Sequence, residues 1–329
     1  LAEVLHDAGL DIRGSDMAES SNTLTLRERG IPIHIGHSAD NVTDDISFVI
    51  RTAAVHDDNP EVHEAHRRGI PVFERTQAWG ALMRGYQNAL CISGTHGKTT
   101  TTSMCTHIMM AAEKDPTVMI GGTLPLLKAC HRVGKGNTII MESCEYYNSF
   151  LALNPTIAVV LNIEADHLDF FKDLEDIKHS FRCFAERVPA ETGTVIANYD
   201  DANTMDALRG IARKVITFGL NAKADVYAQN IVHRGSVSEF DIYHRGNYFA
   251  RVTLHVPGIH NVRNALAATA AAIVLGVSSN AVKYGLAGFE GAGRRFDFKG
   301  KFQGADLYDD YAHHPSELRA LLDAVDTLN

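Results

Sequence analysis

The chain has 329 residues, 45% of them hydrophobic, which is enough to fill more than one core and predicts two or three domains. Its formal net charge of −9 argues against a general nucleic-acid or membrane-binding surface, so a phosphate-bearing ligand must meet a local basic site. The apolar runs are shorter than a membrane span, and the five cysteines are odd in number and scattered, which predicts a soluble, cytoplasmic protein with reduced thiols rather than disulfides or a cysteine zinc site.

The first 76 residues alternate short strand-like and helix-like segments, a pattern typical of a parallel sheet with helices on its faces. Asp16 follows the first strand, where such sheets bind ribose or a nucleotide, although a turn or N-cap aspartate explains it equally well. The chain opens with helical spacing but without an N-cap, as if it began inside a helix. Strands are expected at residues 10–13, 31–35, 47–51 and 71–73, and helices at residues 24–30, 59–69 and 76–83.

A strand, a glycine-bounded loop and a helix follow one another at residues 89–110. The loop reads G-x-x-G-K-T, a shortened phosphate loop, because Ile92 stands where the longer form has its first glycine. Backbone N–H groups and the positive end of the helix bind phosphate in such loops, the lysine adds charge, and the threonine hydroxyl can ligate Mg²⁺. The alternative is an ordinary glycine turn before a threonine-rich helix. The predicted phosphate-binding residues are Gly94, Thr95, His96, Gly97, Lys98, Thr99 and Thr100.

Residues 138–142 and 156–162 are apolar runs typical of buried strands. The first ends in Glu142, and the second leads directly to His167. Because ligands of open α/β sheets collect beyond the carboxyl ends of the strands, both side chains are expected beside the phosphate loop, where Mg²⁺-ATP needs ligands. Two simpler explanations stay open: Glu142 as a surface carboxylate, and the Glu-Ala-Asp-His run as a solvated turn before the helix of residues 173–188.

The rest of the chain offers one further binding feature. Asn261 and Asn264 share a face of an alanine-rich helix that runs to Leu275, and their amides suit an adenine edge, although N-capping explains Asn261 alone. Three glycines at residues 288–293 indicate a hinge. The other predicted elements are strands at 194–197 and 214–218 around a helix at 202–211, antiparallel strands at 225–230, 238–244 and 248–255, a strand pair at 295–302 and 305–309, and a helix at 315–328.

In this order, the motifs resemble the Mur ligases of peptidoglycan synthesis across essentially the whole chain, and the joint pattern is far more specific than any one motif. The His96 form of the loop, Glu-Ala-Asp-His and Asp-Asp-Tyr-x-His-His-Pro resemble the branch that joins L-alanine to UDP-N-acetylmuramate. The segments that carry the resemblance are 94–100, Glu142, 162–167, 260–265, 294–296 and 309–315.

The resemblance implies an α/β fold in three parts. These are a Rossmann-like UDP-sugar-binding domain at residues 1–76, a central P-loop ATPase-type domain with an antiparallel β subsheet at 77–293, and the beginning of a Rossmann-like amino-acid-binding domain at 294–329. Family members begin with a strand and a glycine-rich turn and end with a full third domain. We therefore expect a fragment that binds Mg²⁺-ATP without forming an amide bond.

The resemblance also implies roles for single residues. Lys98, Glu142 and His167 would be catalytic, with Lys98 on the β- and γ-phosphates. Thr99 and Glu142 would hold a first Mg²⁺, and His167 would belong to a second metal site. The remaining implied contacts are the phosphate loop with ATP, Asn261 and Asn264 with adenine, Arg295 with the phosphates, Asp310 with the ribose side, and Asp16 with the UDP-sugar.

The implied reaction is ATP-dependent acyl activation. The muramoyl carboxylate attacks the γ-phosphate to give an acyl phosphate, and the amine of L-alanine then displaces phosphate from it. The implied partners are these small molecules, with no nucleic acid and no membrane insertion, and the oligomeric state stays open. Three alternatives also stay open: a ligase that reattaches a recycled tripeptide to the same UDP-sugar, a P-loop switch or motor that only hydrolyses ATP, and a non-catalytic nucleotide-binding module.

Overall fold

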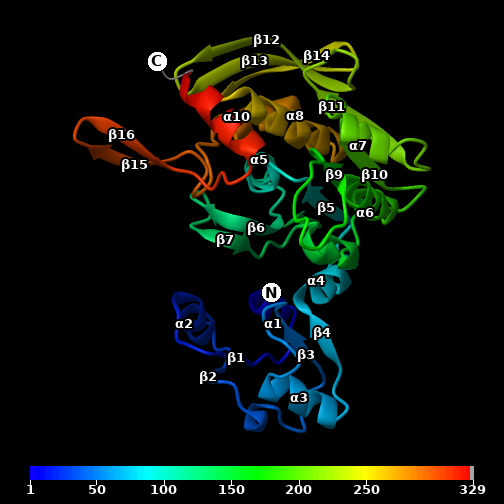
Figure 1. Cartoon of the computed structure of the whole chain (residues 1–329), viewed down its shortest axis with the longest axis vertical. Helices are drawn as coiled ribbons and strands as arrows, with labels where there is room; N and C mark the ends of the chain where they lie inside the picture. Colours follow the sequence, from blue (N-terminus) through cyan, green and yellow to red (C-terminus); the bar gives the residue numbers. More distant parts are fainter. Residues whose placement is uncertain (327–329) are drawn as a thin grey trace. The chain divides into compact units, whose positions relative to one another are not determined.

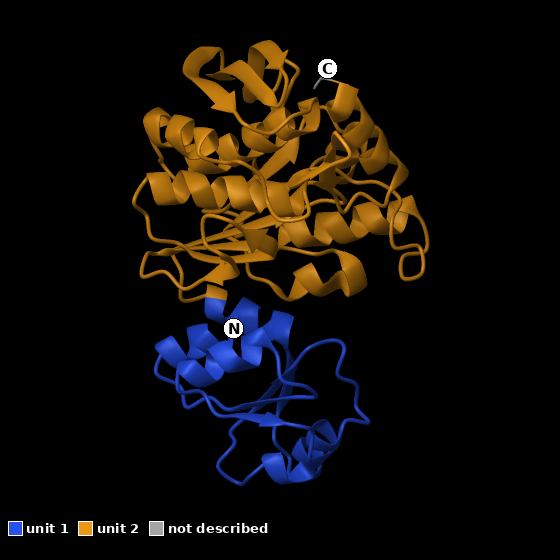
Figure 2. Cartoon of the chain, turned by 90° about the vertical axis from the view of Figure 1, so that its left-hand side faces the viewer, with its two compact units in different colours: residues 1–82 blue, residues 83–329 orange. Residues whose placement is uncertain are grey.

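The computed structural model describes residues 1–326 and contains two compact units, residues 1–82 and residues 83 onward (Figures 1 and 2). Each unit mixes helices and strands, so the predicted α/β class is confirmed. Within the described range, no helix combines the length and the apolar character that crossing a bilayer requires. All five cysteines are free, and Cys91 and Cys105 are buried.

The first unit is built on two small parallel strand pairs. Strand β1 (Gly14–Asp16) pairs with β2 (Ile33–Ile35), and β3 (Val49–Arg51) pairs with β4 (Val72–Glu74). The prediction of a strand at residues 10–13 is wrong, because the residues that pair with β2 are the next three, Gly14–Asp16. The helices of this unit are α1 (Ala2–Asp7), α2 (Ser21–Glu28), the 3₁₀ turn η1 (Ala39–Asn41), α3 (Pro60–Arg67) and all but the last residue of α4 (Arg75–Met83).

The second unit is organised around a ten-stranded sheet in the order β14-β13-β12-β11-β10-β9-β5-β8-β6-β7. Its central strands, from β6 to β12, are parallel, and β7, β13 and β14 add antiparallel pairs at the two edges, which confirms the predicted antiparallel subsheet. The strands are β5 (Asn88–Ser93), β6 (Thr117–Leu124), β7 (Ala129–Arg132), β8 (Thr138–Glu142), β9 (Ile157–Val160), β10 (Thr194–Asn198), β11 (Lys214–Gly219), β12 (Val226–Arg234), β13 (Val237–His244) and β14 (Asn247–Leu254).

Strand β5 lies between β8 and β9, its neighbours in space but not in sequence. In register, Ile92 pairs with Glu142 on one side and with Val159 on the other. The carboxyl ends of all three strands therefore meet at one edge of the sheet, as the sequence predicts. This edge carries the phosphate loop.

Helices cover the sheet and complete its core. On one face, α5 (Lys98–Ala111) packs against α8 (Ile259–Val274) and α9 (Ser279–Ala287) in an apolar cluster. Elsewhere Phe150, from the 3₁₀ segment η2 (Tyr146–Ala152), stacks on Phe184 of α6 (Leu174–Glu186) with ring centroids 4.6 Å apart. A further helix, α7 (Ala202–Ala207), contacts α6 and β10.

Among the α-helices and β-strands, β6, β7 and α9 were not predicted, and neither were the 3₁₀ segments η1 and η2. Helix α9 is short and contains Gly285, which weakens its helical signal. The glycine is there for packing, because a Cβ atom at this position would lie 2.5 Å from the Cα atom of Ile108 in α5. The two helices thus approach each other backbone to backbone.

The chain continues as a hairpin and a helix. Strands β15 (Asp297–Phe302) and β16 (Ala305–Asp309) pair antiparallel, as expected, and α10 (Pro315–Asp326) follows them (Figure 1). Residues 327 and 328 of the helix predicted here lie outside the described residues. The side of α10 that carries Ala324 approaches the start of α8, where a Cβ atom on Gly258 would lie 3.2 Å from the Cβ atom of Ala324.

Candidate nucleotide site

The phosphate loop joins β5 to α5 and is anchored by one amide side chain. Asn162, just after β9, accepts a hydrogen bond from the backbone N–H of His96 at 2.8 Å and donates one to its carbonyl at 3.1 Å. Gly97, the N-cap of α5, has a left-handed φ of 82°, and a Cβ atom there would lie 2.6 Å from Oδ1 of Asn264. Glycine is therefore required at this position for both its backbone angle and the close approach of α8.

Lys98 is held by a buried carboxylate that the sequence analysis missed. Its Nζ donates to the carbonyls of Gly94 and Thr95 at 2.5 and 3.0 Å, and it lies 3.1 and 3.0 Å from the two carboxylate oxygens of Glu145. Glu145 is only 2% exposed. The sequence feature that could have indicated Glu145 is its position three residues after Glu142, at the end of the same strand.

The side-chain oxygen atoms of Thr99 and Glu142 lie close together at the same end of the loop. The Thr99 hydroxyl donates to Glu142 at 3.0 Å, and the other carboxylate oxygen accepts from the backbone N–H of Gly121 at 2.6 Å. A Cβ atom on Gly121 would lie 2.4 Å from the carboxylate, so only glycine leaves the space that Glu142 occupies. A hydroxyl and a carboxylate are ligands that Mg²⁺ prefers, and the residues present therefore fit this ion.

His167 lies on the same side of the sheet. Its backbone has a positive φ of 53°, and its ring stacks on Tyr146 with centroids 4.2 Å apart. Its Nε2 atom is 3.9 Å from Glu145, the carboxylate that also holds Lys98. The structure thus brings Lys98 and His167 to one acidic group and joins Glu142 to Thr99, which is the convergence that the sequence predicts.

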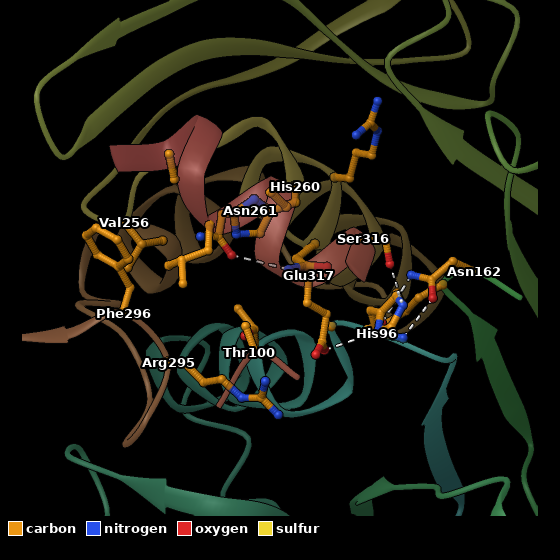
Figure 3. Close-up of a pocket in the computed structure, with 18 of the residues that line it drawn as sticks. His96, Thr100, Asn162, Val256, His260, Asn261, Arg295, Phe296, Ser316 and Glu317 are labelled. Carbon is orange, nitrogen blue, oxygen red and sulfur yellow. Dashed lines mark hydrogen bonds and ion pairs between the residues drawn. The ribbon is translucent and has the colours of Figure 1, made fainter. Parts of the chain in front are cut away.

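A cavity of about 310 Å³ lies next to the loop, at the start of α8 and beside α10 (Figure 3). Asn261 and Asn264 are each 7% exposed, and the amide of Asn264 donates to that of Asn261 at 3.2 Å. Burial lowers the pKa of the adjacent His260, which favours its uncharged form. The predicted ATP-binding residues that line the cavity are His96, Gly97, Thr100, Asn261, Asn264, Arg295 and Asp310.

Two of these residues also have structural contacts. The Asp310 carboxylate accepts from the backbone N–H groups of Phe296 and Ala312, both at 2.7 Å, and so ties the end of β16 to the start of β15. The Arg295 guanidinium lies 5.3 Å from the centre of the Tyr311 ring. Both of these cavity-lining side chains are therefore positioned by contacts within the chain.

Asp16 belongs to the first unit. Its carboxylate accepts from the backbone N–H of Ala18 at 3.3 Å, the short-range contact of a turn aspartate. The sequence analysis left this alternative open. Its assignment to the UDP-sugar stays a prediction.

Comparisons with known proteins agree with this geometry. Residues 92–272 match the sequence profile of the Mur ligase middle domain, and residues 1–87 match that of the Mur ligase family, catalytic domain. The UDP-N-acetylmuramate–L-alanine ligase of Agathobacter rectalis is 46% identical over 325 residues, which are 98% of this chain and 71% of that protein. The chain belongs to the Mur ligase family.

Further relatives within the Mur ligase family carry the same name. The UDP-N-acetylmuramate–L-alanine ligase of Caldicellulosiruptor bescii is 44% identical over 98% of this chain and 70% of its own length. Among solved structures, the UDP-N-acetylmuramate–alanine ligase of Thermotoga maritima aligns with a TM-score of 0.81 at 31% identity, covering 99% of this chain and 75% of that one. This Mur ligase is of the ATP-dependent, amide-bond-forming type. The expectation that the 329-residue chain binds Mg²⁺-ATP without forming an amide bond stays a prediction.

Proposed function

We propose that this Mur ligase joins L-alanine to the carboxylate of UDP-N-acetylmuramate through an acyl phosphate, in peptidoglycan synthesis. The observation that carries the proposal is the cluster of Lys98, Thr99, Glu142 and His167 at one sheet edge, beside a cavity with two buried asparagines. The names of the relatives that are 42–46% identical support the choice of substrates.

In this proposal Thr99 and Glu142 hold a first Mg²⁺, and His167 belongs to a second metal site. The support is chemical: the oxygen pair at 3.0 Å offers hard ligands, and the glycine at 121 leaves room for them. When bound, Mg²⁺ offsets the negative charge that otherwise keeps a carboxylate away from a triphosphate.

The residues of the chain bind and orient the reactants. Lys98 turns from Glu145 toward the β- and γ-phosphates of ATP, Asn261 and Asn264 read the adenine edge, and Arg295 contacts the phosphates. A muramoyl carboxylate oxygen attacks the γ-phosphorus and ADP leaves. The nitrogen of L-alanine then attacks the acyl carbon, phosphate leaves, and the amine loses a proton. Asp310 contacts the ribose side, and Asp16 holds the UDP-sugar.

We further propose that domain boundaries fall after residues 76 and 293, and that the enzyme acts in the cytoplasm. The first boundary is supported by the division of the chain near residue 82 and by the two family profiles, which meet between residues 87 and 92. The location is supported by the need for ATP, which is made and kept in that compartment.

The test is a substrate screen with the full-length protein. ATP, Mg²⁺ and UDP-N-acetylmuramate are supplied with L-alanine, glycine, L-serine or a tripeptide, and ADP, phosphate and the amide product are measured. We expect turnover with L-alanine and loss of turnover in Lys98→Ala. Preference for the tripeptide identifies the recycling ligase, phosphate release without an amino acid identifies an ATPase, and no release in any mixture leaves only a binding module. Each of these three results contradicts the proposal.

A further inference from the structure

A second polar cluster lies beside the cavity, at the meeting point of three segments far apart in the sequence. His96 comes from the phosphate loop, Glu164 from the loop after β9, and His314 from the residue before α10. One possible ligand atom of each lies within 4.8 Å of the others. We call these three residues the His96–Glu164–His314 cluster. Its side chains play no part in the Mg²⁺ site proposed at Thr99 and Glu142.

Two of the three distances in the cluster are close to those of a tetrahedral metal site, and the third, between the two imidazoles, is at most 4.8 Å. The Oε2 atom of Glu164 is 3.5 Å from Nε2 of His96 and 3.6 Å from Nδ1 of His314. Ligands placed about 2.0–2.1 Å from a tetrahedral Zn²⁺ are about 3.3–3.4 Å from one another, so small side-chain shifts suffice. The Ser316 hydroxyl lies 3.0, 2.8 and 2.7 Å from the His96, Glu164 and His314 atoms, at the fourth side of the group.

A further carboxylate orients one of the two imidazoles. Nδ1 of His96 is 3.1 Å from Oε1 of Glu317, and this contact is visible in Figure 3. With a proton on Nδ1, His96 presents the lone pair of Nε2 to the cluster. A ligating histidine almost always has such an outer partner, which fixes its tautomer and ring orientation. His96 is therefore arranged as metal-ligating histidines are.

The chemistry of the donors selects the kind of ion. Two imidazole nitrogens and one carboxylate suit Zn²⁺, Co²⁺ or Ni²⁺, whereas Mg²⁺ prefers oxygen ligands alone. We propose that the His96–Glu164–His314 cluster binds a transition-metal ion of this class, with Ser316 or water in the fourth position. Such an ion ties the start of α10 to the phosphate loop. Since Ser316 and Glu317 also line the cavity, the bound ion fixes one of its walls.

The arrangement has one metal-free counterpart. In it, the Ser316 hydroxyl donates to Glu164 and forms hydrogen bonds with Nε2 of His96 and Nδ1 of His314, whose directions depend on the histidine tautomers, so three polar atoms share a single oxygen. In the metal-bound form both imidazoles present lone pairs instead. The two arrangements predict different results when metal is added, because only the metal-binding one gives a Co²⁺ spectrum that depends on these three side chains.

The test is a Co²⁺ titration of the nucleotide-free, full-length protein, read by visible absorption. We expect an intense spectrum of low-coordinate Co²⁺ that Zn²⁺ abolishes and that excess Mg²⁺ leaves unchanged. The matched variants are His314→Ala, which removes a ligand, and His313→Ala, which alters the neighbouring residue outside the cluster. The His313 side chain is 61% exposed, and its Nδ1 atom lies 3.5 Å from the Glu317 carboxylate. His314→Ala should bind Co²⁺ at least about tenfold more weakly, and His313→Ala should match the wild type.

Two more variants keep the result clear. Glu164→Gln, which preserves side-chain size, repeats the comparison if His314→Ala fails to fold. His167→Ala should retain the Co²⁺ spectrum, which separates this site from the proposed Mg²⁺ positions. Equal Co²⁺ affinity in the wild type, His314→Ala and Glu164→Gln, or only the weak spectrum of octahedral Co²⁺, overturns the proposal and leaves the serine-centred hydrogen bonds as the whole role of the cluster.

Discussion

The pairing of Lys98 with Glu145 predicts that the free enzyme holds its phosphate-binding lysine in an ion pair that ATP must break. Replacing Glu145 with glutamine keeps the shape of the side chain and removes its charge. At about 3.0 Å the gross Coulomb attraction is about 5–6 kcal/mol for an effective dielectric constant of about 20. Desolvation offsets part of this, and Lys98 keeps two carbonyl acceptors, so we expect a net loss of about 2–3 kcal/mol.

The same variant should bind nucleotide more tightly. In the wild type the γ-phosphate competes with Glu145 for the ammonium, whereas in Glu145→Gln the phosphate supplies the missing negative charge. If about 1–2 kcal/mol of the pairing energy is given up on binding, affinity for a non-hydrolysable ATP analogue rises about fivefold to thirtyfold. The melting temperature of the ligand-free protein should fall by about 4–12 °C.

Thermal unfolding and titration calorimetry measure the two effects. A double-mutant cycle with Lys98→Met isolates the energy of the ion pair. The interaction energy is the difference between the stability loss of the double variant and the sum of the losses in the two single variants. Glu142→Gln is the matched control, since this carboxylate contacts Thr99 and Gly121 and not Lys98. If Glu145→Gln is as stable as the wild type, or if its effect and that of Lys98→Met simply add, the reasoning is refuted.

Three further predictions follow from the site and its supporting helix. Gly97→Ala should weaken ATP binding well beyond its effect on stability, because the new methyl group meets Asn264; Gly210→Ala, with a similar φ of 68° and open space around it, measures the backbone strain alone in the same calorimetry. Thr99→Val should raise the Mg²⁺ concentration needed for half-maximal turnover while leaving metal-free nucleotide affinity within about twofold, and an unchanged Mg²⁺ requirement contradicts the assigned ligand. Burial lowers the pKa of His107 to about 4, so its contribution to the free energy of unfolding is complete above about pH 6.5 and is lost as the pH falls toward 4. In His107→Phe, the free energy of unfolding measured by chemical denaturation should therefore change by about 2–3 kcal/mol less over that pH window than in the wild type. A wild-type-like pH profile would show that another group titrates.

Much of the site was readable from the sequence because its parts are local. The strand, glycine turn and helix of the phosphate loop lie within residues 88–111, and each backbone requirement is met by a neighbour in the chain. The apolar runs of β8 and β9 likewise predict buried strands, and the first of them ends at Glu142. The antiparallel hairpin at β13 and β14 follows from its turn residues, where Arg245 and Gly246 take positive φ angles.

The elements that sequence reasoning missed depend on partners distant in the chain. Strand β6 has a glycine pair in place of a clear alternation, and it is a strand because it pairs with β8 and β7 in the sheet. Glu145 reads as one more acidic residue after a strand, and only the fold buries it against Lys98. Helix α9 needs glycine at position 285 because a side chain there would clash with the backbone of Ile108, which lies 177 positions earlier in the chain.

The sequence by itself determined the chemistry of this protein, because the types of residue in the phosphate loop and at the strand ends, and their short spacings, are fixed by the covalent chain. Only the tertiary structure decided which of these groups meet. Placing β5 between β8 and β9 brings Glu142 and Glu145 to the loop, and the path of α10 brings His314 to His96. These contacts join residues dozens to hundreds of positions apart, and their energy depends on burial and distance, which exist only once the sheet has formed.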